Sequence, residues 1–215
     1  MEAKLQRLID SIRETAAPAR GLLVPVSGGT DSALTFWLCA QAFPEKVMAV
    51  HVGTDLPHAE WFKIFGRVER LPSVVGEDDI GRWARFLRLS IAGDRWLVGS
   101  RNRTEHELGQ FSLASRLASY LPISGVWKSD VLALCRLIGA PEAMIARSLE
   151  PDPDCGRPAE LSAIPYALTE AFLKEKLGEI PEGSAPLDAA ARAYLEETFR
   201  GDRFKPRLPT MGVRL

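Results

Sequence analysis

The chain has 215 residues, of which 46% are apolar and 26% are charged, and its formal net charge is −1. This length and balance predict one soluble globular domain, residues 1–215, and the near-zero charge argues against nucleic acid as a partner. No apolar run approaches the roughly 20 residues that a membrane span needs, and the charged N-terminus is unlike a signal peptide. We therefore expect a cytoplasmic protein with no membrane partner.

Apolar residues recur at helical spacing in the first segment, which predicts an N-terminal amphipathic helix within residues 1–16. Further strands are expected at residues 21–26, 46–52 and 95–100, and further helices at residues 32–43, 57–68, 78–92, 105–120, 128–138, 166–177 and 188–199. A turn is expected near residues 139–148, and an extended tail at residues 203–215. Because strands alternate with long helices, the sequence predicts an α/β fold with an open parallel β-sheet sandwiched by helices.

Two of the three cysteines lie in apolar helical patterns. Cys39 and Cys135 have this setting, and Cys155 lies in a polar loop. An odd number of widely spaced cysteines predicts free thiols rather than a disulfide framework.

The stretch PVSGGTDS, residues 25–32, directly follows the first predicted strand. Ligands of an open parallel sheet bind beyond the carboxyl ends of the strands, which is where this stretch lies. Glycines allow close backbone approach, hydroxyls donate hydrogen bonds, and the amides that open the next helix favour an anion such as phosphate. The residues expected to hold that anion are Ser27, Gly28, Gly29, Thr30 and Ser32. A glycine turn with a simple helix cap is the alternative.

An aspartate, Asp31, stands inside this loop. A carboxylate repels phosphate unless a cation lies between them, and Mg²⁺ commonly takes one or two carboxylates together with phosphate oxygens. Asp31 is therefore a candidate magnesium ligand. No Lys-Ser/Thr pair follows the glycines, so the loop is not a Walker A motif.

The SGGTDS loop resembles the pyrophosphate loop of the N-type ATP pyrophosphatases, which share a Rossmann-like, adenine nucleotide α-hydrolase-like fold. Within that group, LVGSRNRTEHELGQFS (residues 97–112) resembles the NAD synthetase motif L-V-x-G-T-x-N-[KR]-[ST]-E-x-x-x-G-Y-F-[ST]. LPISGVWKSDVLALCRLIGAPEAMI (121–145) and ELSAIPYALTEAFL (160–173) resemble two further stretches of that family in the same order. The likeness runs from about residue 21 to the C-terminus.

The resemblance implies that ATP and Mg²⁺ are cofactors and carries several roles to single positions. Glu105 inherits a magnesium role beside Asp31, and Lys128 inherits a contact to ATP phosphate, so Lys128 and Asp31 are the candidate catalytic residues. Arg82 is a candidate ATP contact, although a solvated basic face shared with Arg85 is an equal alternative. The candidate contacts to the acceptor are Asn102, Arg103 and Asp154.

The implied reaction is the synthesis of NAD. The carboxylate of nicotinic acid adenine dinucleotide attacks the α-phosphorus of ATP, pyrophosphate leaves, and ammonia displaces AMP. The resemblance also implies a homodimer, with the first helix either at the dimer surface or packed on the core. Because no glutaminase domain is visible, ammonia comes free or from a separate glutaminase subunit.

Two stretches depart from the family pattern. LASRLASYLPIS (113–124) replaces a K-[YH]-G-D-G segment that helps to form the dinucleotide site, and EPDPDCGRPAEL (150–161) is shorter than its counterpart. Two alternatives therefore stay open: the same chemistry on a different carboxylate, or a non-catalytic nucleotide-binding homologue. tRNA thiolation is disfavoured because Cys155 lacks a paired cysteine. His51, at the end of the second strand, is interpreted as a structural histidine rather than an adenine contact.

Overall fold

Four parallel strands form the central sheet of the protein, whose computed structural model describes residues 1–152 and 157–202. The strand order is β3-β2-β1-β4. The strands are β1 (Leu22–Pro25), β2 (Val47–Val52), β3 (Val68–Leu71) and β4 (Trp96–Leu97). β1 is central, since Leu22 lies opposite both Val47 and Trp96. The predicted α/β fold with a parallel sheet is confirmed.

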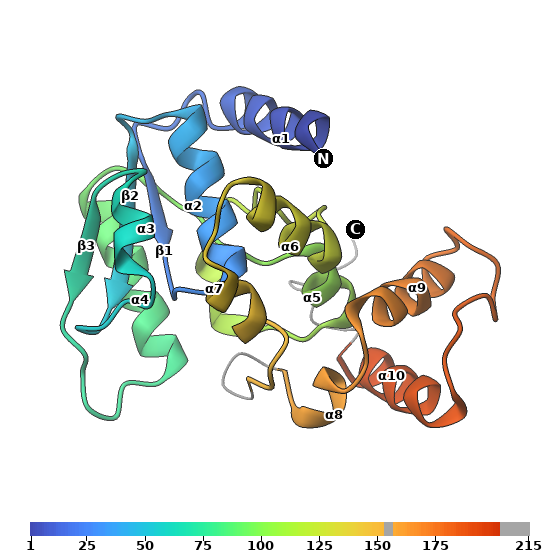
Figure 1. Cartoon of the computed structure of the whole chain (residues 1–215). Helices are drawn as coiled ribbons and strands as arrows, with labels where there is room; N and C mark the ends of the chain where they lie inside the picture. Colours follow the sequence, from blue (N-terminus) through green and yellow to red (C-terminus); the bar gives the residue numbers. More distant parts are fainter. Residues whose placement is uncertain (153–156, 203–215) are drawn as a thin grey trace, which may run out of the picture.

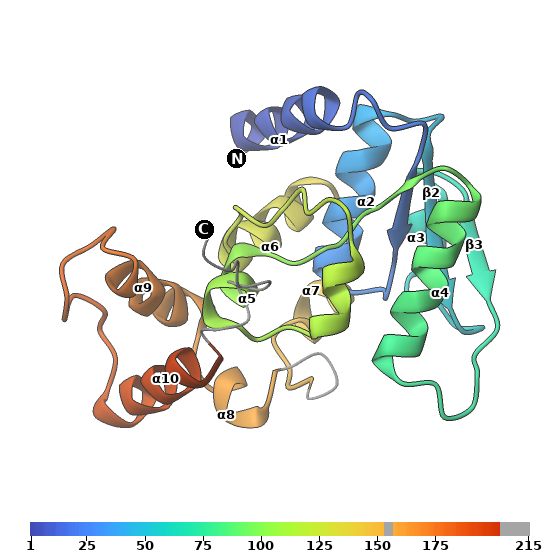
Figure 2. The same ribbon diagram turned by 180° about the vertical axis from the view of Figure 1, so that it is seen from behind.

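Helices cover both faces of this sheet (Figures 1 and 2). On one face lie α1 (Glu2–Thr15), α2 (Thr30–Ala42), α3 (Ala59–Lys63), α6 (Lys128–Leu137) and α7 (Glu142–Arg147). On the other lies α4 (Asp79–Ala92). Side chains of β1 alternate between them, because Leu22 and Val24 join the larger core while Leu23 packs with Phe86 of α4.

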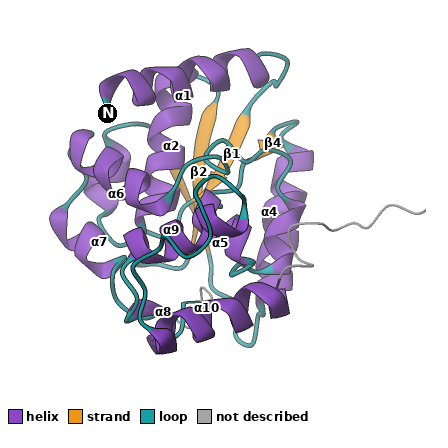
Figure 3. Cartoon of the chain, turned by 90° about the vertical axis from the view of Figure 1, so that its right-hand side faces the viewer, coloured by secondary structure: helices purple, strands orange, loops and turns teal. Residues whose placement is uncertain are grey.

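A second group of helices extends away from the sheet. It comprises α5 (Arg103–Leu108), α8 (Ala159–Ser162), α9 (Tyr166–Lys176) and α10 (Ala189–Asp202). Leu108, Phe172 and Leu195 are nearly or fully buried in their shared core. Figure 3 shows α1 at one end of the molecule and α8 and α10 at the other, towards which the strands of Figure 1 point.

The apolar face of α1 packs inward. Ile9 and Ile12 are buried in the main core, and Leu5 and Leu8 are packed against it. The structure therefore favours the core-packing interpretation of this face over a dimer surface.

Three local predictions were wrong. The helix expected at 57–68 is the short α3, and β3 follows it, because the edge strand Val-Glu-Arg-Leu has no apolar alternation to reveal it. The helix expected at 105–120 ends at Leu108, where Gly109 adopts a left-handed φ of 80°, and a 3₁₀ turn follows at Leu113–Leu117. The turn expected at 139–148 contains the helix α7.

Other expectations divide between confirmed and untested. Cys39 and Cys135 are free and buried, as expected. No helix in the described part of the chain is long and apolar enough to cross a membrane. Asp154, Cys155 and the predicted tail at 203–215 lie outside the described residues.

Candidate functional site

The SGGTDS loop joins the carboxyl end of β1 to the first turn of α2. Gly28 has a φ of +89°, and a Cβ at this position would lie 2.8 Å from the Cβ of Pro57, so both backbone angle and space require glycine. The Ser32 hydroxyl donates to the Gly29 carbonyl oxygen at 3.0 Å and accepts from the Ser27 amide at 3.2 Å. The loop is thus folded tightly around the start of α2, whose amides carry partial positive charge.

Lys128, the first residue of α6, reaches this loop from 97 positions further along the chain. Its side chain is nearly buried, and the ammonium donates to Thr30 Oγ1 at 2.9 Å and to Asp31 Oδ2. An ordinary solvated lysine is excluded by this burial. Its ammonium instead forms an ion pair with the Asp31 carboxylate of the loop.

Asn102 connects the loop to α5. Its side-chain Oδ1 accepts from the Glu105 amide at 2.9 Å, and Glu105 Oε2 accepts from the Asn102 amide at 3.3 Å, which is a capping box. Asn102 Nδ2 donates to Asp31 Oδ1 at 2.8 Å. The cap of one helix therefore orients the carboxylate that opens another.

Asp31 and Glu105 form an acidic pair at the carboxyl edge of the sheet. Burial and the negative charge of Asp31 raise the pKa of Glu105 to about 8, although the Lys128 ammonium opposes the shift. In the described part of the chain, no three or more His, Cys, Asp or Glu side chains are grouped to hold a metal ion by themselves. Mg²⁺ held jointly with substrate phosphate needs only one or two carboxylates, so the pair fits such an ion.

Glu170 of α9 is nearly buried and supports this site through hydrogen bonds to residues of α5 and α6. It accepts from the Ser129 amide at 2.8 Å, from the Ser129 hydroxyl, and from Thr104 Oγ1 at 3.1 Å. Thr104 Oγ1 in turn accepts from the Lys128 amide at 2.9 Å. Sequence reasoning missed Glu170, although one acid inside the apolar helix pattern YALTEAFL was its signal.

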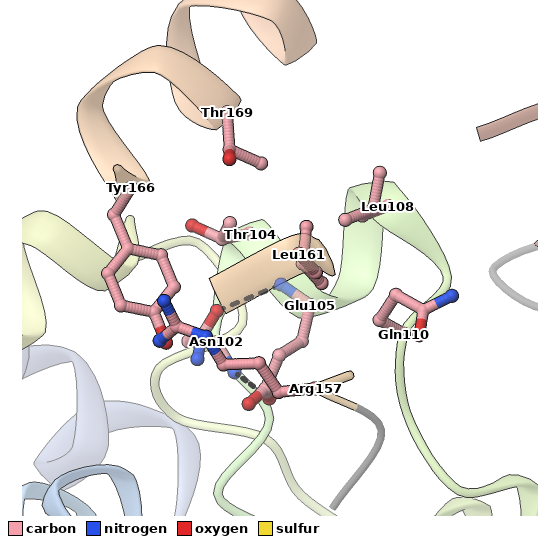
Figure 4. Close-up of a pocket in the computed structure, with 9 residues that line it drawn as sticks. All are labelled: Asn102, Thr104, Glu105, Leu108, Gln110, Arg157, Leu161, Tyr166 and Thr169. Carbon is pink, nitrogen blue, oxygen red and sulfur yellow. Dashed lines mark hydrogen bonds between the residues drawn. The ribbon is translucent and has the colours of Figure 1, made fainter. Parts of the chain in front are cut away.

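Arg157 and Tyr166 close the site from the side of α8 and α9 (Figure 4). The Arg157 guanidinium lies 3.9 Å from the centre of the Tyr166 ring and donates to the Ser148 carbonyl oxygen at 2.7 Å. They border a pocket of about 40 Å³ lined by Asn102, Thr104, Glu105, Leu108, Gln110, Arg157, Leu161, Tyr166 and Thr169. Sequence reasoning also missed Arg157, although it lies in the stretch at 150–161 that departs from the family pattern.

The remaining candidates lie apart from this cluster. Arg82 is exposed near the start of α4, and the structure records no contact between it and the described site residues. Arg85, its neighbour on α4, donates to Glu77 Oε2 at 2.8 Å. Arg103 lies over the Trp127 ring at 4.2 Å. The ATP role of Arg82 and the acceptor role of Arg103 stay predictions.

Two candidates have their polar groups committed within the protein. The His51 Nδ1 atom is 2.8 Å from the Val26 carbonyl oxygen, as expected of a structural histidine. The side-chain oxygen and nitrogen of Asn102 are hydrogen-bonded to Glu105 and Asp31, so its proposed contact to the acceptor substrate also stays a prediction.

The fold and this cluster define a Rossmann-like α/β protein with an acid–lysine site at the carboxyl edge of its sheet. No family model matches the chain. In sequence the chain is similar to NH3-dependent NAD+ synthetases. It is 23% identical to that of Campylobacter jejuni over 235 residues, covering 95% of each chain, and 29% identical to that of Carboxydothermus hydrogenoformans over 180 residues, covering 68% of this chain and 74% of the relative.

Solved structures agree on the fold. The NH3-dependent NAD synthetase from Campylobacter jejuni superposes with a TM-score of 0.75 at 19% identity, covering 99% of both chains. An NMN synthetase from Francisella tularensis also gives a TM-score of 0.75, at 16% identity, covering 99% of this chain and 98% of the other. At these identities the likeness demonstrates a shared architecture.

Proposed function

We propose that the protein is an ATP-dependent, ammonia-dependent ligase that converts the carboxylate of nicotinic acid adenine dinucleotide into the amide of NAD. The observation that carries this proposal is the cluster of Thr30, Asp31, Asn102, Glu105 and Lys128 at the carboxyl end of β1. The sequence likeness to NH3-dependent NAD+ synthetases over 95% of both chains supports it.

The proposed reaction has two steps. The acceptor carboxylate attacks the α-phosphorus of ATP, the bond from that phosphorus to the β-phosphate oxygen breaks, and pyrophosphate leaves. Ammonia then attacks the acyl carbon, and the bond from this carbon to the bridging oxygen breaks. AMP leaves with that oxygen, which came from the acceptor carboxylate, and the nitrogen loses a proton. The protein contributes mainly position and charge stabilisation, since no covalent enzyme intermediate is needed.

The residues have distinct parts in this proposal. The loop glycines and the amides that open α2 bind the leaving pyrophosphate, and the Lys128 ammonium balances the charge that develops on it. Asp31 and Glu105 would hold Mg²⁺, which supplies charge neutralisation on phosphate oxygens when bound. Asn102 keeps Asp31 in place for that role.

A second acceptor is favoured by two observations. The stretch at 113–124 lacks the family segment that helps to form the dinucleotide site, and an NMN synthetase has the same fold over nearly its full length. The second candidate reaction is therefore the same amidation on the acid form of NMN, a smaller acceptor.

One assay separates these proposals. The purified protein is incubated with MgATP, ¹⁵N-ammonium and either the dinucleotide or the mononucleotide acid, and product mass and pyrophosphate are measured. Labelled NAD with equimolar pyrophosphate, abolished by Asp31→Ala, supports the first proposal, whereas labelled NMN alone supports the second. Binding of ATP with no product from either acceptor would support the alternative that the protein is a non-catalytic nucleotide-binding homologue.

We further propose a cytoplasmic homodimer that uses free ammonia or ammonia from a separate glutaminase subunit. Sedimentation equilibrium measures the assembly, and comparison of ammonium with glutamine as nitrogen donor tests the source.

A further inference from the structure

Arg157 brings a second positive charge to the site, on an element that the cluster around Lys128 does not use. In Figure 4 its side chain lies between those of Glu105 and Tyr166, which line the same pocket. Nη1 donates to the Ser148 carbonyl oxygen at 2.7 Å, while Nε is buried and has no hydrogen-bond partner among the described residues. A buried donor without a partner costs free energy, so a ligand oxygen that accepts a hydrogen bond from Nε would be favoured.

A short chain of contacts ties Arg157 to the phosphate loop. The Ser148 hydroxyl is 2.8 Å from Thr30 Oγ1, and the Ser148 carbonyl oxygen accepts from Arg157 and, at 3.2 Å, from the Tyr166 hydroxyl. Burial lowers the pKa of Arg157, and the negative charge of Asp31 opposes this shift. The guanidinium therefore lies at the mouth of the loop rather than on a remote surface.

The two cations of the site differ in what already balances them. The Lys128 ammonium contacts Asp31 directly, so its charge is largely compensated within the protein. The structure records no salt bridge between Arg157 and another described residue, and its planar face rests on Tyr166. A guanidinium held in this way can bind two oxygens of one phosphate through parallel hydrogen bonds.

We propose that Arg157 is a further catalytic residue, which binds phosphoryl oxygens of the ATP polyphosphate chain as pyrophosphate leaves. Partial burial beside Leu161 and Tyr166 strengthens such a contact, because water screens it less than at an exposed site. The inference rests on the proposed use of ATP, but it can be tested without turnover.

The first test is calorimetric titration of wild type, Arg157→Gln and Arg157→Lys with inorganic pyrophosphate in the presence of Mg²⁺. We expect Arg157→Gln to bind at least about tenfold more weakly and Arg157→Lys to fall between, because lysine keeps the charge but not the bidentate geometry. Arg147→Gln is the matched control, since Arg147 is exposed and pairs with Glu150 at the surface. Thermal melts verify that each variant is folded. If Arg157→Gln does not fold, pyrophosphate binding by Arg157→Lys decides the test.

The outcome separates this inference from the proposed function. If Arg157→Gln, or Arg157→Lys where Arg157→Gln does not fold, binds pyrophosphate within twofold of wild type, the inference is wrong even where wild type makes NAD or NMN. If pyrophosphate binding falls but wild type makes neither product, the inference stands and the amidation proposal fails. If wild type binds neither pyrophosphate nor MgATP, both fail.

Discussion

Asp31 and Asn102, which are 71 positions apart in the chain, are joined by a 2.8 Å hydrogen bond that couples the opening turn of α2 to the cap of α5. The aspartate ends a loop after β1, and the asparagine follows β4, the neighbouring strand. Parallel pairing of these two strands brings their carboxyl ends together, so one side chain serves both helices.

The first prediction concerns Asn102. Replacement by alanine should lower the free energy of unfolding by about 1–2 kcal/mol through loss of the cap alone, and further because Asp31 loses a donor. Urea unfolding measures the change. Ser112→Ala is the control, since Ser112 caps an exposed 3₁₀ turn by accepting from the Ala114 amide. Equal losses in the two variants would argue against a coupled site.

The second prediction concerns pH and Glu105. Its folded pKa of about 8 lies above its ordinary value of 4.5, so the neutral form favours the folded state. That contribution is fully present below pH 4.5 and is lost as pH rises through 8. In Glu105→Gln the loss should be absent, so without Mg²⁺ and nucleotide the variant should gain stability relative to wild type between pH 5 and 8. Urea unfolding across this range measures it.

The control for that experiment is Glu150→Gln, because Glu150 is exposed and pairs with Arg147 on the surface. A pH-independent difference between wild type and Glu105→Gln would contradict the shifted pKa. Added Mg²⁺ with pyrophosphate should shrink the difference, since ligand binding favours the charged carboxylate.

The third prediction concerns Lys128. Lys128→Met leaves the Asp31 carboxylate beside Glu105 without its cation, and breaking such a nearly buried pair should cost about 3 kcal/mol or more. Pyrophosphate release from MgATP should also fall by at least about 100-fold, as expected for loss of a charge that stabilises the leaving group. Lys63→Met, which removes an exposed lysine paired with Glu60, should change neither quantity appreciably.

The fourth prediction concerns Glu170, which contacts no proposed ligand. Glu170→Ala leaves the Ser129 amide and two hydroxyl groups without their acceptor, so we expect a loss of about 2–4 kcal/mol in urea unfolding. Glu170→Gln keeps one acceptor oxygen and should lose less. Because α6 presents Lys128, kcat should fall more than the KM for ATP rises in the glutamine variant. A pure change in KM would indicate a different role.

Much of the site was accessible from local patterns. The apolar run before SGGTDS placed the loop at a strand end, and the resemblance of residues 97–112 to a family motif indicated Glu105, which the structure shows to form a capping box with Asn102. These features depend on residues within a few positions of each other, where short-range geometry dominates.

Two other features escaped, one because it depends on a distant partner and one because a local helix end was hidden by the pattern that follows it. β3 is a strand only because it pairs with β2, and its own residues have no strand alternation. Gly109 ends α5 through its left-handed φ, which the helical spacing of the following apolar residues concealed.

The sequence by itself determined the alternation of strands and helices and the glycine loop that contains Asp31, since these follow from neighbouring residues, and the resemblance of residues 97–112 to a family motif added Glu105 as a candidate. Only the tertiary structure decided that Lys128 pairs with Asp31 and that Glu170 joins α5 and α6 through hydrogen bonds. It also decided that Arg157 lies over the Tyr166 ring beside the pocket. The physical reason is that charge compensation and burial depend on residues that the fold brings together across the chain, 41 positions apart for Ser129 and Glu170 and 97 for Asp31 and Lys128, and no spacing rule within one segment encodes such contacts.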